Sequence, residues 1–450
     1  MKIESSLDAR STQPGCATNV AATGLNPTNL MKLVLKTFYV RGIETPKELS
    51  NSTGLHIAIA KELLDTAKDK GLAQVLGSFD EDGYTSFRYG LTGMGREWAV
   101  DALAQCQYIG PAPVTLDDYR SQVLRQSVKN EHVQRDLLVD RLSHLVVPEA
   151  LERNLGPAVN SGRSLLLYGP PGNGKTSIAE AIAKTFHGNI HIPYCLEVEG
   201  EIIKIFDPIV HFEASPEVED ADRTSDATPC RPEYTDRRWL RCRRPVVMVG
   251  GELTLSMLDL YYSPVAKFYE APLQMKANGG TFIVDDVGRQ LINPKDLLNR
   301  WIIPMEKRID YMVLQTGGNF SIPFDNLLIF STNLDPADLM DPAFLRRIPY
   351  KVEVLYPNEA EFRTVFETVC RENDLELSDD AVAYAMHEIR SIHSQPLAFY
   401  QPKFIVDQII ATSKYEDRKP ELSKDLLAAA IANISAQSTE TGLPDSTPRA

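Results

Sequence analysis

A chain of 450 residues has few folds open to it once it contains the segment SLLLYGPPGNGKTSIAEAIAK, found here at residues 164–184. An apolar strand, a glycine-rich turn and an amphipathic helix follow one another, as the pattern G-x-x-x-x-G-K-T requires. The three glycines allow successive N–H groups to point at phosphate oxygens, at the positive end of the helix that begins near Lys175. The segment predicts a phosphate-binding loop made of Gly169, Pro170, Pro171, Gly172, Asn173, Gly174, Lys175, Thr176 and Ser177.

Two carboxylates end a second apolar strand, TFIVDD, at residues 281–286. Lys175 is expected to reach the β- and γ-phosphates of a nucleotide, and Thr176 to place its hydroxyl on Mg²⁺. Asp285 is expected to hold the metal through water and Asp286 to polarise the attacking water. Paired acids at a strand end also serve as helix N-caps. Their position about 110 residues after the loop favours the catalytic interpretation.

A third strand, NLLIFSTN, ends at Asn333, which is placed to hold the same water or to sense the γ-phosphate. Asparagine after a strand is also an ordinary turn residue. The segment DPAFLRR then ends in Arg346 and Arg347. These arginines either compensate a helix C-terminus or act as an arginine finger on the γ-phosphate of a neighbouring subunit. We favour the finger, with Arg347 ahead of Arg346.

Residues 28–110 show short helices, a hairpin signal around DEDG and a further helix, an order that predicts a winged helix-turn-helix domain. Such a domain can read DNA with its second helix. However, residues 28–104 carry nine Lys or Arg against ten Asp or Glu, and the wing tip is acidic. We therefore favour a protein-interaction module over a DNA reader.

Composition limits the remaining possibilities. The net charge of −14 disfavours nucleic acid as the main partner, although a local basic face is compatible with it. No apolar run is long enough to span a membrane and no signal peptide is seen, so we expect a cytoplasmic protein with reduced, scattered cysteines. Residues 1–27 and 435–450 lack apolar periodicity and are expected to be disordered tails, with a linker at 111–137.

The stretch between the first two motifs is long and contains an insert at about 196–245. It begins with a hairpin signal that turns at Glu199 and Gly200. A cluster of five arginines follows between residues 237 and 244, and either forms a solvated or inter-subunit face or contacts a substrate. Lys267, Phe268 and Tyr269 fit either a polypeptide grip or a core aromatic pair.

Taken in order, GPPGNGKT, FIVDD, IFSTN and DPAFLRR resemble the AAA+ ATPase family over residues 138–432. The string ANGGTFIVDDVG is similar to the segment around the second motif in sigma-54 activators. The string DDVGRQLINPKDLLNRWIIPMEKR is similar in layout to the same region of MoxR-type ATPases. A hairpin signal around TGGN corresponds to the pre-sensor hairpin of the branch that also carries a helix-2 insert. The resemblance implies an α/β fold, a P-loop AAA+ parallel sheet at 138–355 with a helical lid at 356–434, preceded by the small winged helix-turn-helix domain.

The resemblance also implies the cofactors ATP and Mg²⁺ and a homo-oligomeric ring, expected to be a hexamer. Lys403 is the nearest match to the lid residue that touches the γ-phosphate. Two departures stand out: the second acid is Asp286 where many relatives have Glu, which suggests slow hydrolysis, and no GAFTGA loop is present.

We expect Mg²⁺-dependent ATP hydrolysis by a ring that remodels an unknown protein client. Two alternatives are an ATP-regulated DNA-binding regulator and a chelatase-type ATPase subunit.

Overall fold

The computed structural model describes residues 13–81, 84–214, 235–392 and 395–438. Among these residues, no helix is both long and apolar enough to cross a membrane. The chain divides into two compact units, each made of segments that are distant in sequence. The first unit comprises Met1–His132, Phe186–Ile283 and Gln290–Leu328, and the second comprises Val133–Thr185, Val284–Arg289 and Ile329–Ala450.

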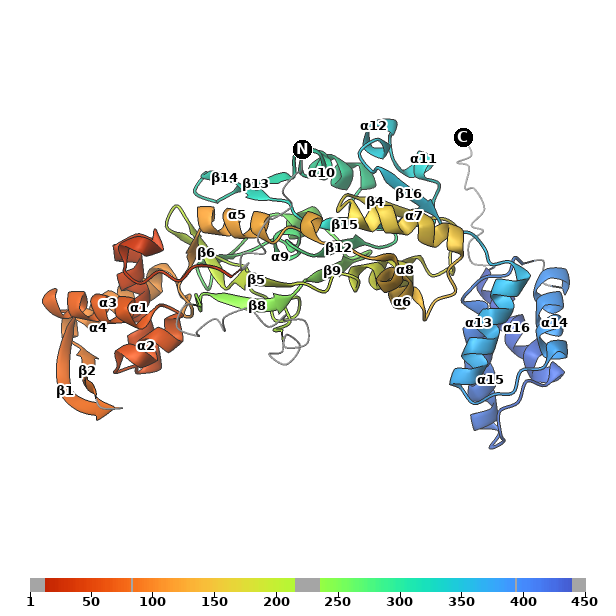
Figure 1. The fold of residues 1–450 in the computed structure, drawn as a ribbon, viewed down its shortest axis with the longest axis horizontal. Coiled ribbons are helices and arrows are strands. Elements are labelled where there is room, and N and C mark those ends of the chain that lie inside the picture. The colour runs from red at the N-terminus through yellow and green to blue at the C-terminus, as the bar shows by residue number, and fades with distance from the viewer. Residues whose placement is uncertain (1–12, 82–83, 215–234, 393–394, 439–450) are drawn as a thin grey trace, which may run out of the picture. The chain divides into compact units, whose positions relative to one another are not determined.

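Helices and one hairpin form the N-terminal part of the first unit (Figure 1). The side chain of Asn26 caps the first helix by accepting a hydrogen bond from the Thr28 N–H, and Thr45 and Glu48 form a capping box at the second. The hairpin expected from the sequence is present as an antiparallel pair. The elements are α1 (Pro27–Arg41), α2 (Pro46–Thr53), α3 (Ile57–Asp69), β1 (Ala73–Glu81), β2 (Tyr84–Leu91) and α4 (Gly93–Gln105).

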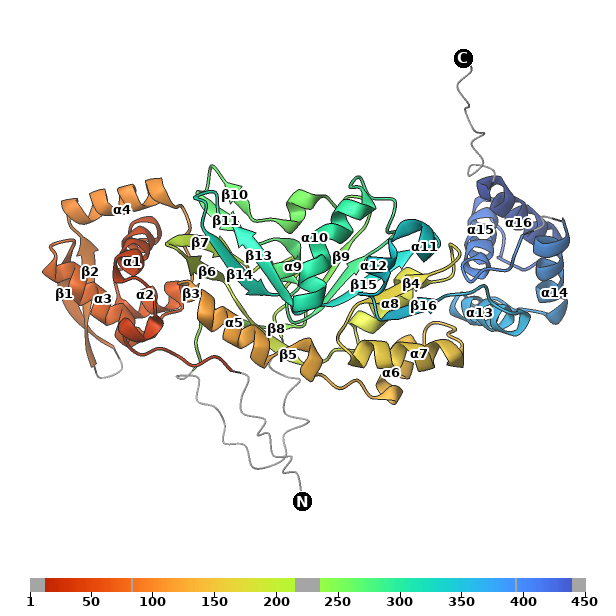
Figure 2. The same cartoon turned by 90° about the horizontal axis from the view of Figure 1, so that it is seen from above.

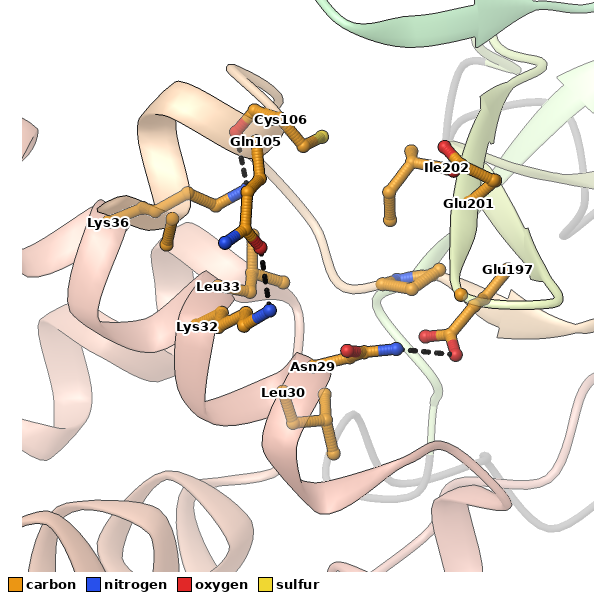
Figure 3. A pocket seen from close by; sticks show the side chains of 13 residues that line it. Asn29, Leu30, Lys32, Leu33, Lys36, Gln105, Cys106, Glu197, Glu201 and Ile202 are labelled. Carbon is orange, nitrogen blue, oxygen red and sulfur yellow. Dashed lines mark hydrogen bonds between the residues drawn. The ribbon is translucent and has the colours of Figure 1, made fainter. Parts of the chain in front are cut away.

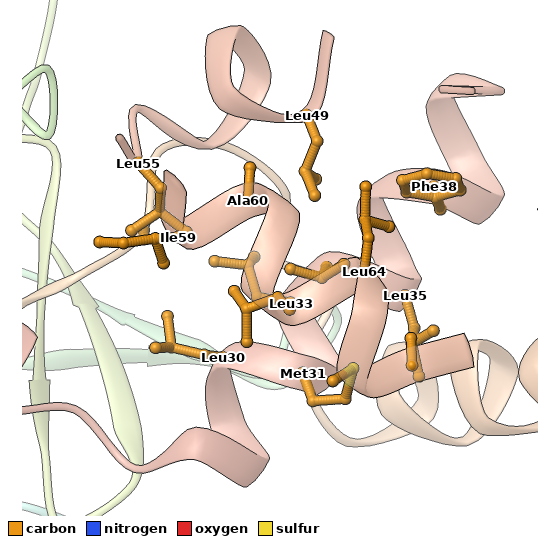
Figure 4. Close-up of a cluster of buried hydrophobic side chains, with 14 of the residues drawn as sticks. Leu30, Met31, Leu33, Leu35, Phe38, Leu49, Leu55, Ile59, Ala60 and Leu64 are labelled. Atoms are coloured by element: carbon orange, nitrogen blue, oxygen red, sulfur yellow. The ribbon is translucent and has the colours of Figure 1, made fainter. Parts of the chain in front are cut away.

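Leucines of α1, α2 and α3 pack into one apolar cluster (Figure 4). Val20 and Leu25, each 7% exposed, belong to it, and a short 3₁₀ helix, η1 (Ala21–Thr23), lies between them. The expectation of a disordered tail over residues 1–27 is therefore wrong for residues 13–27. Two isolated apolar residues in a polar segment give no periodic signal, although burial of both is favourable. At the other end, the last helix continues to Ser438.

The rest of the first unit is rich in strands (Figure 2). A mixed sheet has the order β10-β11-β7-β6-β3, and its hairpin β6–β7 turns at Glu199 and Gly200 as predicted. The predicted hairpin around TGGN is also present. The elements are β3 (Val114–Thr115), α5 (Leu116–Arg125), η2 (Val128–Asn130), β5 (Asn189–Pro193), β6 (Cys195–Val198), β7 (Glu201–Lys204), β8 (Trp239–Arg243), β9 (Val246–Val249), η5 (Leu255–Leu258), β10 (Tyr261–Ser263), β11 (Phe268–Glu270), α9 (Leu273–Lys276), β12 (Thr281–Val284), α10 (Pro294–Lys307), β13 (Ile309–Val313) and β14 (Asn319–Pro323).

Much of the arginine cluster holds the first unit together. The guanidinium of Arg238 forms a buried ion pair with Asp236 at 2.7 Å, and that of Arg244 pairs with Glu131 at 2.6 Å. Arg237 donates to Asn51 and to the Ser50 hydroxyl of α2. For these three arginines, structural ion pairs and hydrogen bonds replace the solvated or substrate-binding face considered above.

The aromatic set at residues 267–269 is also structural. Tyr269 is 2% exposed, and its hydroxyl accepts a hydrogen bond from the Gln315 N–H. Phe268 packs edge to face on Tyr108 with ring centroids 5.8 Å apart. Of the two interpretations, the structure favours the core aromatic pair.

A buried histidine makes the first unit sensitive to acid. Burial, aided by the charge of Arg241, lowers the pKa of His191 to about 4. An unfolded chain has a histidine pKa of about 6.5, so it binds a proton at a pH where the folded chain does not. The stability that neutral His191 contributes is present above about pH 6.5 and is lost as the pH falls towards 4.

We expect wild-type protein to lose about 2 kcal/mol more of its free energy of unfolding between pH 7.5 and 5 than His191→Gln loses. Urea unfolding at the two pH values measures the difference. Exposed His132 provides the matched control, because His132→Gln should follow the wild type. An equal loss in wild type and His191→Gln would contradict the assignment.

The second unit is organised around strand β4. Strand β4 pairs in parallel with β15 on one side and β16 on the other, with Leu165 of β4 opposite Ile329 of β15 and Tyr350 of β16. Leu165, Leu166 and Leu167 are fully buried, as expected for a central parallel strand. The elements are α6 (Arg135–Leu142), α7 (Glu149–Asn160), β4 (Leu165–Tyr168), α8 (Lys175–Ala183), β15 (Leu327–Thr332), α11 (Pro336–Leu339), α12 (Pro342–Leu345) and β16 (Tyr350–Glu353).

Helices α13 to α16 (Figure 1) complete the part of the second unit that the structure describes, and a π-helical turn follows α14. A capping box formed by Asn358 and Glu361 begins the first helix. Phe362, Phe366 and Ile405 lie in the shared apolar core. The elements are α13 (Glu359–Glu372), α14 (Asp379–His387), the π-helical turn η6 (Glu388–Ile392), α15 (Gln401–Tyr415) and α16 (Lys424–Ser438).

Candidate functional site

The glycine-rich loop joins β4 to α8 as the sequence predicts. Gly169, Gly172 and Gly174 have φ values of 133°, 76° and 81°, which L side chains rarely adopt. A Cβ on Gly169 would also stand 2.4 Å from the carbonyl oxygen of Val354. The loop therefore needs glycine for both conformation and space, and it leads directly into the N-terminus of α8.

Lys175 begins α8 and is only 6% exposed. Its Nζ donates to the carbonyl oxygens of Gly169 at 3.0 Å and Pro170 at 2.8 Å. Burial lowers the pKa of Lys175, while the charges of Asp286 and Asp285 act in the opposite direction. The ammonium thus lies within the loop, held by carbonyl groups that a phosphate can replace as its partner.

Asp285 follows β12 and meets the loop helix. The Thr176 hydroxyl lies 2.9 and 3.1 Å from the two carboxylate oxygens of Asp285. The hydroxyl of Ser331, from β15, also donates to this carboxylate. Three segments distant in sequence therefore meet at one carboxylate.

This oxygen set suits Mg²⁺, a hard cation held in nucleotide sites by one or two protein oxygens together with phosphates and water. Thr176 and Asp285 would hold the ion, which would neutralise charge on the phosphates. Such a site needs no cluster of three or more acidic, histidine or cysteine ligands, and none occurs among the residues that the structure describes.

Asp286 lies beside Asp285 with its backbone in the left-handed region, at φ 49°. The Asn333 side-chain amide donates to the Asp286 carboxylate at 3.0 Å. The backbone N–H of Asp286 lies 3.4 Å from the Ser331 hydroxyl. Asp286 and Asn333 both line a cavity of about 840 Å³ that also contains the loop. The structure thus brings together the acid and the asparagine that the sequence singles out.

The same cavity is closed on one side by the start of α15. The Tyr400 N–H donates to the Gly172 carbonyl at 3.1 Å, and the Phe399 N–H donates to the Asn173 side chain at 3.3 Å. A Cβ on Gly172 would stand 2.4 Å from the Tyr400 ring. The lining is completed by residues 144–147 and by apolar side chains of α13. The phosphate loop therefore lies beside an apolar compartment that could hold the base of a nucleotide.

Lys403 lines this cavity but is well solvated. Its side chain is 70% exposed, and its Nζ pairs with the Asp407 carboxylate at 3.0 Å. Lys403 therefore lies here as an ordinary solvated lysine, and its contact with a γ-phosphate stays a prediction.

The two arginines of DPAFLRR do not line the cavity. Arg346 is exposed at the end of α12, and Arg347 is half-buried, with its carbonyl accepting a hydrogen bond from the Ser164 hydroxyl at 3.1 Å. Both are therefore separate from the phosphate loop of their own chain, and their role as a finger stays a prediction.

Sequence reasoning missed Ser331 and the contacts of Phe399 and Tyr400. Ser331 stands two positions before Asn333 in STN, where the alternation of a strand could have placed both side chains on one face. Phe399 and Tyr400 contact the loop across more than 220 residues of sequence. No local pattern in SQPLAFYQP indicates such a contact.

Removing the Ser331 hydroxyl should lower ATP turnover. Because Ser331 orients Asp285, Ser331→Ala should reduce kcat by about 10- to 100-fold and raise the Mg²⁺ concentration needed for half-maximal activity. Nucleotide binding without Mg²⁺ should not change, which separates this effect from misfolding. Ser161→Ala is the control: it removes a hydroxyl at the C-terminal end of α7, where it bonds to the Ala158 carbonyl, and should retain wild-type kinetics. Unchanged Mg²⁺ dependence in Ser331→Ala would contradict the role.

Two family models match parts of the chain. Residues 165–208 match the ATPase family associated with various cellular activities (AAA), and residues 358–433 match a domain of unknown function, DUF8689. A search of curated proteins finds no match. The first match covers the phosphate loop, and the second covers α13 to α16 almost completely.

Solved structures give weaker likenesses. NtrX from Brucella abortus is 15% identical, with 68% of this chain and 60% of that chain covered at a TM-score of 0.41. The Thermotoga maritima RuvB Holliday junction branch migration motor is 14% identical, with coverages of 66% and 73% and a TM-score of 0.35. Domain III of the T. maritima replication initiation protein DnaA is 10% identical, with coverages of 65% and 95% and a TM-score of 0.36.

Proposed function

We propose that the chain is an AAA+ ATPase that assembles into a ring and uses Mg²⁺-dependent ATP hydrolysis to remodel a protein partner. The observation that carries the catalytic part is the meeting of Thr176, Asp285, Asp286 and Asn333 beside the phosphate loop. These groups supply oxygens for a metal, a base, and an amide that orients the base, beside the cavity that contains the loop.

Each side chain has a distinct task in this proposal. Lys175 leaves its loop carbonyls to contact the β- and γ-phosphates. Asp286 accepts the proton of the attacking water, and Asn333 keeps that carboxylate oriented towards the cavity. Phosphoryl transfer needs mainly positioning and charge stabilisation, which these residues provide.

The ring is supported by the position of the arginines. Arg346 and Arg347 lie outside the cavity of their own chain. If one of them stabilises charge on a γ-phosphate, that phosphate belongs to a neighbouring subunit, and a repeated head-to-tail contact whose rotation closes forms a ring. A hexamer is our working expectation.

A protein partner is favoured over DNA by the surroundings of the helix-turn-helix. Glu62, on the candidate recognition helix α3, accepts a hydrogen bond from the Val20 N–H, so the segment before α1 contacts that helix. Arg237 binds the end of α2, and a Cβ on Gly54 in the turn would stand 2.8 Å from the Arg237 carbonyl oxygen. The polar residues of α3 and its C-cap also mix Lys61, Lys68 and Lys70 with Glu62, Asp65 and Asp69, a charge balance that gives little attraction for DNA phosphates.

Two measurements test the proposal. Analytical ultracentrifugation with ATP should reveal a closed oligomer, and phosphate release should depend on Mg²⁺ and disappear in Lys175→Ala. A mobility-shift assay across salt concentrations tests the DNA-binding alternative, because phosphate contacts produce a salt-dependent affinity. Tight, salt-dependent DNA binding by a monomer would overturn the proposal. The chelatase-type alternative requires a metal-binding partner subunit and fails if the purified ring remodels a protein without one.

A further inference from the structure

A second cavity lies in the first unit, apart from the residues of the nucleotide site. It has a volume of about 160 Å³ and is bounded by α1, the end of α4 and the hairpin β6–β7 (Figure 3). About the same volume in an apolar cavity accommodates benzene, so this one has room for a small metabolite. Its charged groups are arranged on two walls.

Two lysines of α1 form the basic wall. Lys32 and Lys36 are four residues apart and therefore lie on one face of the helix. The Lys36 Nζ donates to the Cys106 carbonyl at 2.9 Å, and the Lys32 Nζ donates to the Gln105 side chain at 2.7 Å. Each ammonium has three donors, so both retain capacity for another acceptor.

Lys36 is the more deeply buried of the two lysines. It is only 5% exposed, and its acceptor is a neutral carbonyl rather than a carboxylate. Burial lowers the pKa of Lys36, as expected for a cation without a counter-ion. A buried ammonium of this kind is stabilised by an anion that enters the cavity.

Two glutamates of the hairpin β6–β7 form the acidic wall. Glu197 accepts a hydrogen bond from the Asn29 amide at 3.0 Å, and Glu201 lies across the turn. Among the described residues, no ion pair within 4.0 Å connects either glutamate to Lys32 or Lys36, although all four line the cavity. Groups of opposite charge thus face one another across a gap.

We propose that this cavity binds a free α-amino acid. The ligand carboxylate would accept hydrogen bonds from Lys36 and Lys32, and its ammonium group would donate to Glu197 and Glu201. A phosphate or a dianion suits the cavity less well, because the two glutamates would repel it. A bound amino acid would connect α1 to the hairpin β6–β7, and this binding does not depend on the proposed ring or client.

The test uses the full-length protein and each of the twenty amino acids in isothermal titration calorimetry. At least one should bind with saturation. Its N-acetyl derivative, which lacks the ammonium charge, and its methyl ester, which lacks the carboxylate, should each bind at least about tenfold more weakly. If either derivative bound as tightly as the free amino acid, the assignment of its charged group to a wall of the cavity would be wrong.

Charge-removing variants complete the test. Lys36→Gln and Glu197→Gln should each raise the Kd at least about tenfold. The exposed pair Lys61→Gln and Glu97→Gln should leave it unchanged. If Lys36→Gln does not fold, as judged by its thermal unfolding, Lys32→Gln tests the same wall from a half-buried position. Absence of saturable binding for all twenty amino acids, or equal binding by the wall variants, would overturn the proposal, while the ATPase assays would remain unaffected.

Discussion

Replacement of Asp286 by asparagine should reduce kcat for ATP hydrolysis by about 10²- to 10⁴-fold, the range that one positioned general base contributes. The amide has nearly the shape of the carboxylate but cannot accept the proton of the attacking water. Lys175, Thr176 and Asp285 remain in place, so ATP binding should stay near that of the wild type. Phosphate release and the binding of a fluorescent ATP analogue measure the two properties separately.

The backbone of Asp286 makes this substitution a clean one. At φ 49°, most side chains are strained, whereas aspartate and asparagine adopt this conformation comparatively readily. Asp286→Asn should therefore keep the fold while it removes the base. Asp338→Asn, an exposed change in the same unit, is the control and should leave turnover intact. Hydrolysis at the wild-type rate by Asp286→Asn would show that another group activates the water.

The parts of the site that could be predicted are those encoded by adjacent residues. A loop such as GPPGNGKT needs its glycines, lysine and threonine next to one another, so its geometry follows from a short string. Asp285, Asp286 and Asn333 could be placed because each ends an apolar strand, and parallel strands end at the same edge of a sheet. The hairpins were likewise predicted from their turns.

Contacts between distant segments could not be predicted in this way. The Ser331 hydroxyl meets Asp285 across 46 residues, and the Phe399 N–H meets Asn173 across 226 residues. No periodicity reports such contacts, because they depend on packing rather than on local preference. The arginine cluster illustrates the same difficulty: a basic run looks alike whether water or Asp236 and Glu131 neutralise it.

Replacement of Arg347 by alanine should abolish most ATP hydrolysis and spare ATP binding. By analogy with other phosphoryl-transfer enzymes, an arginine finger contributes about 10³- to 10⁵-fold to kcat. The Ser164 hydroxyl bonds to the backbone carbonyl of Arg347, so alanine keeps this contact. Arg346→Ala is the comparison, because Arg346 is the adjacent and more exposed candidate.

Mixing two inactive variants distinguishes a shared site from a site within one chain. Arg347→Ala retains a sound nucleotide cavity, and Lys175→Ala retains a sound finger. If subunits assort at random in equal amounts, about a quarter of the interfaces combine the two intact halves, because each interface joins one cavity to one neighbouring finger. The mixture should therefore regain partial activity that neither variant has alone. Retention of full activity by both Arg347→Ala and Arg346→Ala would instead remove the finger from this segment, and with it the reason for a site shared between subunits.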